Sequence, residues 1–187
     1  MTQRFSRANR LRAVHLPRND PMPTLFTPER VTCLSLHQPY AGLVAWGAKP
    51  LETRPTRWPA TRPFPHPILI CASAKMDGVA LARLYARIKA TDPKGGLWAL
   101  CHVQGQALAL VDVVGCRPLV AEDEPRSWFW DAEEAAGGVV RWAYEIEQVR
   151  RVQPFPVSGL QGFGRSVPMP LVDAARNAYV ALHGASS

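Results

Sequence analysis

The stretch Leu34–Arg54, LSLHQPYAGLVAWGAKPLETR, decides the fold that we expect for this chain. It continues a β-rich run, residues 31–36, which alternates in the manner of a strand. A helix follows, because three apolar side chains recur at the spacing of one helical face: Tyr40, Leu43 and Val44. Gly47 is placed to end this helix as a left-handed cap. Residues 51–54, which follow Lys49 and Pro50, are then expected to form a short strand.

Three charged side chains at the end of this stretch form the candidate site: Lys49, Glu52 and Arg54. Side chains two residues apart on a strand share a face, so Glu52 and Arg54 point the same way and Thr53 points opposite. Lys49 lies at the helix–strand junction and is free to turn toward either face. Lys and Arg donate charge-assisted hydrogen bonds to a phosphate, and the carboxylate serves as an acceptor or a base. The alternative is an exposed edge-strand salt bridge of little energetic value.

The rest of the chain mixes strand patterns with scattered helical patterns. We expect strands over 68–73, 106–114 and 139–152, and amphipathic helices over 79–89 and 171–183. A length of 187 residues fits one domain with a sizeable core. Because strands outnumber helices, the pattern favours an α+β domain with a small mixed barrel or sheet.

Two segments depart from this pattern. Residues 1–30 hold six Arg and four Pro without periodicity, which predicts a basic, disordered extension; residues 1–21 precede Met22, an alternative start. Residues 120–138 are acidic and predict an insertion with a short helix around Ser127–Trp130. The Trp128 and Trp130 rings either form a contact patch for a protein partner or pack under the insertion.

The net charge of +7 is unevenly distributed along the chain. Residues 1–30 carry +4, residues 49–94 carry +6, residues 112–147 carry −6, and the chain from Arg150 onward carries +3. A basic half that includes the candidate site, beside an acidic half, predicts a polarised surface that steers a polyanion. A mixed-charge surface whose basic excess lies in a tail is the alternative.

Several classes of protein are disfavoured by composition. No run of about eighteen apolar residues is present, which excludes a spanning helix. The N-terminal arginines precede no apolar stretch, which argues against a secretory signal and for a cytoplasmic location. The cysteines are widely spaced and predict buried free thiols: Cys33, Cys71, Cys101 and Cys116. No metal site and no cofactor is predicted, since no ligand pattern is present.

The opening stretch resembles the signature of the ASCH domain, the activating-signal-cointegrator homology family related to the PUA fold. That signature reads approximately L-S-x-x-Q-P-[WY]-A followed by G-x-K-x-x-E-x-R. Residues 38–41 match the first half, and Gly47, Lys49, Glu52 and Arg54 match the second. Two later blocks are also similar, a strand that ends at Lys75 and the turn PVSGLQGF at 156–163. The resemblance covers roughly residues 31–167.

The resemblance implies a PUA-like mixed β-barrel with flanking helices and a basic cleft that binds RNA or single-stranded nucleic acid. The cleft residues that it implies are Gln38, Tyr40, Lys49, Glu52, Arg54, Lys75 and Gln161. Arg57 and Trp58, in the Pro-rich loop that follows, are added because single-stranded bases stack on aromatic rings over a basic groove. Trp46, by contrast, is expected in the core.

Some members of this family are hydrolases, so an enzymatic alternative stays open. One branch removes the acetyl group of 4-acetylcytidine and uses a Lys, a Thr and a Glu. The Lys falls on Lys49, but the Thr position falls on Glu52, and Thr53 is one residue off and faces the other way. Ribonuclease chemistry without a metal needs a base and an acid, for which Lys49, Glu52 and His37 are candidates. His37 is equally a strand-end histidine bonded to the backbone. The substrate is then RNA or a modified nucleoside.

Overall fold

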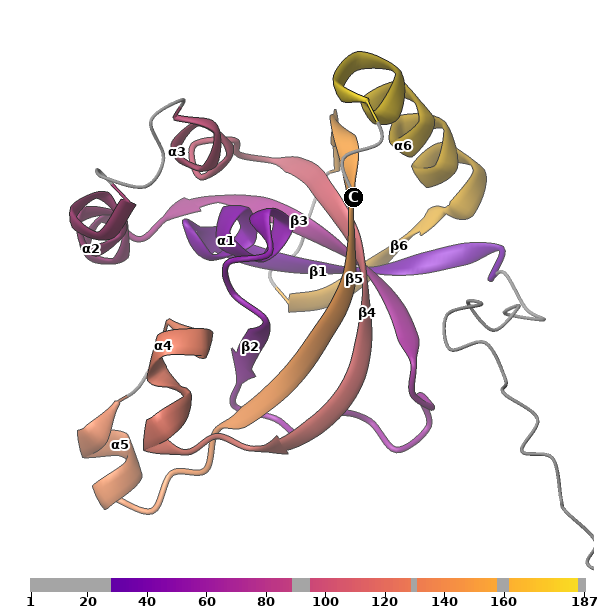
Figure 1. Ribbon diagram of the computed structural model, residues 1–187. Coiled ribbons are helices and arrows are strands. Elements are labelled where there is room, and N and C mark those ends of the chain that lie inside the picture. The colour runs from indigo at the N-terminus through magenta and orange to yellow at the C-terminus, as the bar shows by residue number, and fades with distance from the viewer. Residues whose placement is uncertain (1–27, 89–94, 129–130, 158–161, 185–187) are drawn as a thin grey trace, which may run out of the picture.

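Six strands form one mixed sheet in the spatial order β2-β5-β4-β3-β1-β6. The computed structural model describes residues 28–88, 95–128, 131–157 and 162–184 (Figure 1). The strands are β1 Arg30–Gln38, β2 Leu51–Arg54, β3 His66–Met76, β4 Gln106–Pro118, β5 Trp142–Pro156 and β6 Gly162–Pro168. The helices are α1 Tyr40–Trp46, α2 Gly78–Ile88, α3 Gly96–Leu100, η1 Ala121–Asp123, α4 Glu124–Ser127, α5 Ala132–Ala136 and α6 Met169–His183.

The sheet is curled rather than flat. Only β1 and β3 pair in parallel, while the other neighbours are antiparallel. The long β4–β5 pair shifts its register three times, and such bulges bend a strand and increase its twist. The curl brings the outer strands β2 and β6 toward each other without a hydrogen-bonded pairing between them.

An aromatic cluster joins the two ends of the sheet. Trp58, in the loop after β2, is 5% exposed and packs in the core. Its ring centroid lies 5.1 Å from that of Tyr144 on β5 and 5.6 Å from that of Phe163 on β6. The predicted α+β fold is therefore confirmed, with a barrel-like sheet that side chains close. The prediction that Trp58 offers a stacking surface to bases is wrong, because its ring is buried by β5 and β6.

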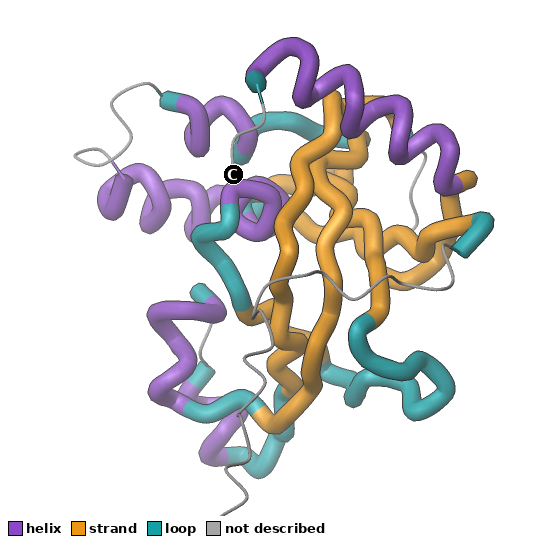
Figure 2. Tube along the Cα trace, turned by 45° about the vertical axis from the view of Figure 1, so that its right-hand side comes forward, coloured by secondary structure: helices purple, strands orange, loops and turns teal. Residues whose placement is uncertain are grey.

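The helices lie on both faces and at one end of the sheet (Figures 1 and 2). Helix α1 covers the core face that contains Leu34, Ile70 and Val111. Helix α6 packs across β5 and covers the opposite face through Val172, next to Leu69. Helices α4 and α5 stand at the end where β4 passes to β5 (Figure 1). No helix in the described ranges is long and apolar enough to cross a membrane.

Most predicted elements are present, and the differences concern side-chain burial and short helices. The short helix expected in the insertion is seen as two, α4 and α5, and α3 was not predicted. Trp46 is 38% exposed, so its expected burial is wrong: the Arg151 guanidinium, 4.1 Å from the ring centroid, covers the ring instead of the core. All four cysteines are free; three are buried and Cys116 is half-buried. The disorder predicted for residues 1–30 concerns almost wholly residues 1–27, which lie outside the described ranges.

Candidate functional site

A pocket of about 150 Å³ opens between the end of β1 and the edge strand β2. Helix α1 ends at Gly47, whose φ of 85° is the left-handed cap that the sequence predicted, and this cap returns the chain to β2. The pocket is lined by Ser35, Leu36, His37, Tyr40, Lys49, Glu52, Thr53 and Arg54. The two halves of the opening motif therefore meet in one site.

A buried ion pair forms the floor of this pocket. Lys49 is 1% exposed, and its Nζ donates to Glu52 Oε2 at 2.9 Å and to the Leu51 carbonyl. The Arg54 Nη1 lies 3.9 Å from Glu52 Oε1. Burial lowers the pKa of Lys49, an effect that the Glu52 charge and hydrogen bond oppose. The interpretation as an exposed salt bridge is thus wrong, because both partners are buried.

Two nitrogen atoms in the pocket wall lack a hydrogen-bond partner. His37 Nε2 and Arg54 Nε are both buried, and within the described ranges neither has an acceptor or donor in reach. Buried polar groups in native proteins are nearly always paired, so these two atoms call for a partner such as a water molecule or a ligand. The sequence left open that the His37 ring is hydrogen-bonded to the backbone; Nε2 of the ring makes no such bond.

Tyr40 forms the wall beside helix α2. Its ring centroid lies 5.9 Å from Lys49 Nζ, and its hydroxyl donates to Asp77 Oδ2 at 3.5 Å. Burial, together with the Asp77 charge, raises the pKa of Tyr40 to about 12. The phenol therefore keeps its proton near pH 7, and its ring offers an aromatic face to the pocket.

Gln38 does not line the pocket. It is fully buried and joins separate segments of the backbone: its Nε2 donates to the Leu100 and Val103 carbonyls at 3.0 and 2.6 Å, and its Oε1 accepts from Gly42 N at 3.0 Å. Its expected contact with nucleic acid is wrong, because no polar atom of its amide faces solvent.

Arg57 and Lys75 are exposed and do not line the pocket. Arg57 follows β2 and lies over the Trp142 ring, 5.3 Å from its centroid. Lys75 is near the end of β3, two residues before the Asp77 that binds Tyr40. Both flank the pocket in sequence without reaching into it. Gln161 lies outside the described residues.

Gln38→Leu is expected to lower the free energy of unfolding by at least about 2 kcal/mol. The variant leaves the part-buried Val103 carbonyl and the buried Gly42 amide without the partner that Gln38 supplies, and each such group costs roughly 1–3 kcal/mol. The Leu100 carbonyl keeps the Val103 amide as its donor. Denaturant unfolding measures the change, with the exposed Gln104→Leu as the matched control. If the Gln38→Leu protein were as stable as the wild type but no longer bound the ligand, Gln38 would be a ligand-binding residue and not a structural one.

The acidic segment 120–138 contacts the chain next to the pocket. Trp128 Nε1 donates to the Ala48 carbonyl at 3.0 Å, directly before Lys49, and the Arg87 guanidinium lies 4.7 Å from the Trp128 ring centroid. Arg117 holds the insertion through two bonds to Asp123, at 2.6 and 2.8 Å. Sequence reasoning left the role of the Trp128 ring open, and the structure assigns it to internal packing. The neighbouring residues 129–130 lie outside the described ranges.

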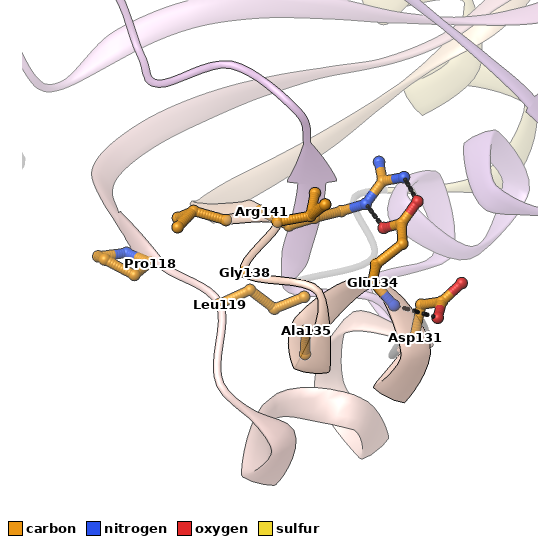
Figure 3. A pocket seen from close by; sticks show the side chains of 9 residues that line it. Pro118, Leu119, Asp131, Glu134, Ala135, Gly138 and Arg141 are labelled. Carbon is orange, nitrogen blue, oxygen red and sulfur yellow. Dashed lines mark hydrogen bonds and ion pairs between the residues drawn. The ribbon is translucent and has the colours of Figure 1, made fainter.

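A second pocket, of about 230 Å³, lies between the end of β4 and α5 (Figure 3). Its charged groups bind one another: Arg141 forms two bonds to Glu134, at 2.6 and 2.7 Å, and Asp131 accepts from the first backbone amides of α5. The rest of the wall is mainly apolar, including Leu119 and Val139. This pocket therefore lacks the unpaired polar groups of the first one.

No group of three or more His, Cys, Asp or Glu side chains is placed to hold a metal ion within the part of the chain that the structure describes. The ionisable side chains that line the first pocket include Lys49, Glu52 and Arg54.

Comparison with known proteins gives one family and one group of structures. The model of the ASCH domain matches residues 34–154. Among solved structures, the ASCH protein of Zymomonas mobilis is 12% identical, with a TM-score of 0.46 over 80% of this chain and 94% of that one. A mutant form of the same protein is 11% identical, with a TM-score of 0.43 over 81% and 96%. A search of the curated proteins found no match.

Proposed function

Because the chain belongs to the ASCH domain family, we propose that its pocket binds one base of an RNA or another single-stranded nucleic acid. The observation that carries this proposal is the pair of buried, unpartnered nitrogens, His37 Nε2 and Arg54 Nε, in one pocket with a buried Lys–Glu pair. The pocket volume is well below the roughly 300 Å³ at which drug-sized sites begin, which fits a single planar group.

The wall chemistry suits a base edge better than a bare anion. Arg54 and His37 offer hydrogen bonds to ring nitrogens or carbonyls, while Glu52 accepts from an exocyclic amine. Tyr40 adds an aromatic face for stacking. The lining carries two cations and one carboxylate, so the phosphates of the strand would be met outside the pocket, by exposed groups such as Arg57 and Lys75. The proposed basic cleft thus consists of the pocket together with these exposed basic groups beside it.

A hydrolase is the alternative function, and the lowered pKa of Lys49 supports it. A Lys amine with a lowered pKa is more often unprotonated, the form that can take a proton from water, and Glu52 at 2.9 Å is placed to exchange that proton. Thr53 borders the pocket, although strand alternation directs its side chain to the face of Leu51. The substrate would be a modified nucleoside such as 4-acetylcytidine, or RNA, and the rate would rise with pH as Lys49 loses its proton.

A protein partner at the insertion and a cytoplasmic location complete the proposal. Such a partner would bind without the Trp128 indole N–H, which is occupied by the Ala48 carbonyl. The four free cysteines support a reducing compartment such as the cytoplasm.

Arg54→Gln is expected to weaken binding of single-stranded RNA roughly 10–100-fold, because hydrogen bonds to charged groups contribute about 1.5–3 kcal/mol. Fluorescence anisotropy with short labelled RNAs measures the dissociation constant. Arg176→Gln on helix α6 removes the same charge far from the pocket and serves as the control. Equal affinities for wild type and Arg54→Gln would contradict the proposal.

The same preparations distinguish the alternatives. Deacetylation of 4-acetylcytidine, or cleavage of the RNA, that disappears in Lys49→Ala would replace simple binding by the hydrolase. Neither binding nor turnover by the wild-type protein would leave the protein partner as the remaining function.

A further inference from the structure

We infer that one side of helix α2, carrying Arg83 and Arg87, binds the phosphates of the strand whose base occupies the pocket. The inference rests on the proposed function and extends it from one base to the neighbouring nucleotides. Both arginines lie within the amphipathic helix that the sequence predicts over 79–89. Three features of the described residues support a more specific role.

The first feature is that helix α2 starts at the pocket. Asp77, directly before the helix, accepts from the Tyr40 hydroxyl at 3.5 Å and from Ala80 N at 3.0 Å, and its own amide donates to the Gln38 carbonyl at 2.7 Å. The N-terminal end of α2 is thereby fixed to a residue of the pocket wall. The Arg83 charge acts on the Tyr40 phenol, where it opposes the raised pKa, as expected for a guanidinium on the pocket side.

The second feature is that the C-terminal end of the arginine-bearing side of α2 lies near the pocket floor. Arg83 and Arg87 are four residues apart and share one side of the helix. Arg87 lies 4.7 Å from the Trp128 ring centroid, and Trp128 binds the carbonyl next to Lys49. The Arg87 end of this side therefore contacts a residue that supports the pocket, while the start of the helix is joined to Tyr40 through Asp77. Leu84 and Ile88 face the core instead.

The third feature is that these cations are accessible. Arg83 is exposed, and no ion pair with it is found among the described residues. Arg87 pairs with Glu124 at 3.2 Å, but the two side chains are 49% and 42% exposed, and surface pairs of this kind contribute little. A phosphate can replace Glu124 there. The two arginines stand about 6 Å apart along the helix axis, which is close to the spacing of successive phosphates in an extended strand.

The test compares an oligoribonucleotide with its free nucleosides at several KCl concentrations. For Arg83→Gln we expect oligonucleotide affinity to fall roughly 3–10-fold and the slope of log K against log[salt] to become shallower by about 0.7, the value for one phosphate contact on a single strand. Binding of the nucleosides, which lack phosphate, is expected to stay unchanged. Arg54→Gln should weaken both ligands, and Arg176→Gln neither.

Each outcome decides the inference. An unchanged slope in Arg83→Gln and in the charge reversal Arg83→Glu, with Arg54→Gln still defective, overturns the α2 contact and leaves the pocket proposal standing. If the wild-type protein bound neither the oligonucleotide nor the nucleosides, both the α2 contact and the pocket proposal would be contradicted. Because Arg83 is exposed, thermal unfolding of its variants should match the wild type, and the comparison is then made on folded protein.

Discussion

Lys49→Met is expected to lower the free energy of unfolding by about 3–5 kcal/mol and to abolish ligand binding. The substitution removes the close partner of the buried Glu52 carboxylate and leaves it only the Arg54 guanidinium, 3.9 Å away. Breaking one half of a buried pair has an effect of this size. The Leu51 carbonyl loses its donor in the same step. Guanidinium unfolding, with the slope compared between variants, measures the loss.

A double variant separates stability from function at this pair. Lys49→Met with Glu52→Leu replaces the pair by apolar groups of similar volume, which is often neutral or stabilising, so most of the lost stability should return. Ligand binding should not return, since the polar floor of the pocket is gone. A double variant that binds RNA as well as the wild type would show that the pair is structural only.

Trp58→Ala is expected to lower the free energy of unfolding by about 3–5 kcal/mol, the range observed for large aromatic side chains in cores. The ring contacts Tyr144, Phe163, Phe64 and His66, and its Nε1 donates to the Arg62 carbonyl at 2.8 Å. Its removal opens a cavity where the two ends of the sheet meet. Thermal and denaturant unfolding measure the effect.

Trp58→Phe serves as the control for a direct role in binding. It keeps an aromatic core residue, so the protein should fold and bind RNA with wild-type affinity. A folded Trp58→Phe or Trp58→Ala protein with selectively weakened RNA affinity would instead support the stacking role that the burial of Trp58 contradicts.

The local pattern of the sequence predicted the helices and strands of the opening stretch, but it did not predict which polar side chains are buried. Alternation and helical spacing predict β1, α1 and β2, and they place Glu52 and Arg54 on one face, where their charged groups lie 3.9 Å apart. Thr53, which alternation places on the opposite face, also borders the pocket. The burial of Lys49 could not be predicted this way. The chain next to Lys49 is held by a residue far away in sequence, because Trp128 donates to the carbonyl of Ala48, eighty residues earlier.

Two wrong predictions have the same physical origin. Gln38 is polar, and polar residues are mostly exposed, but backbone carbonyls of Leu100 and Val103 satisfy it inside the protein. Trp58 lies among prolines, which indicates a surface loop, yet Phe163 and Tyr144 from distant strands enclose it. In both cases the deciding partner is far away in sequence, where periodicity carries no information.

The pairing of β1 with β6 has a consequence for synthesis on the ribosome. Arg30 on the first strand binds Ser166 on the last, 136 residues later. At a translation rate of about 5–20 residues per second, the N-terminal strand therefore waits on the order of ten seconds for this neighbour. During that interval one edge of β1 has no strand to pair with, and the apolar residues that α6 later covers stay accessible to chaperones.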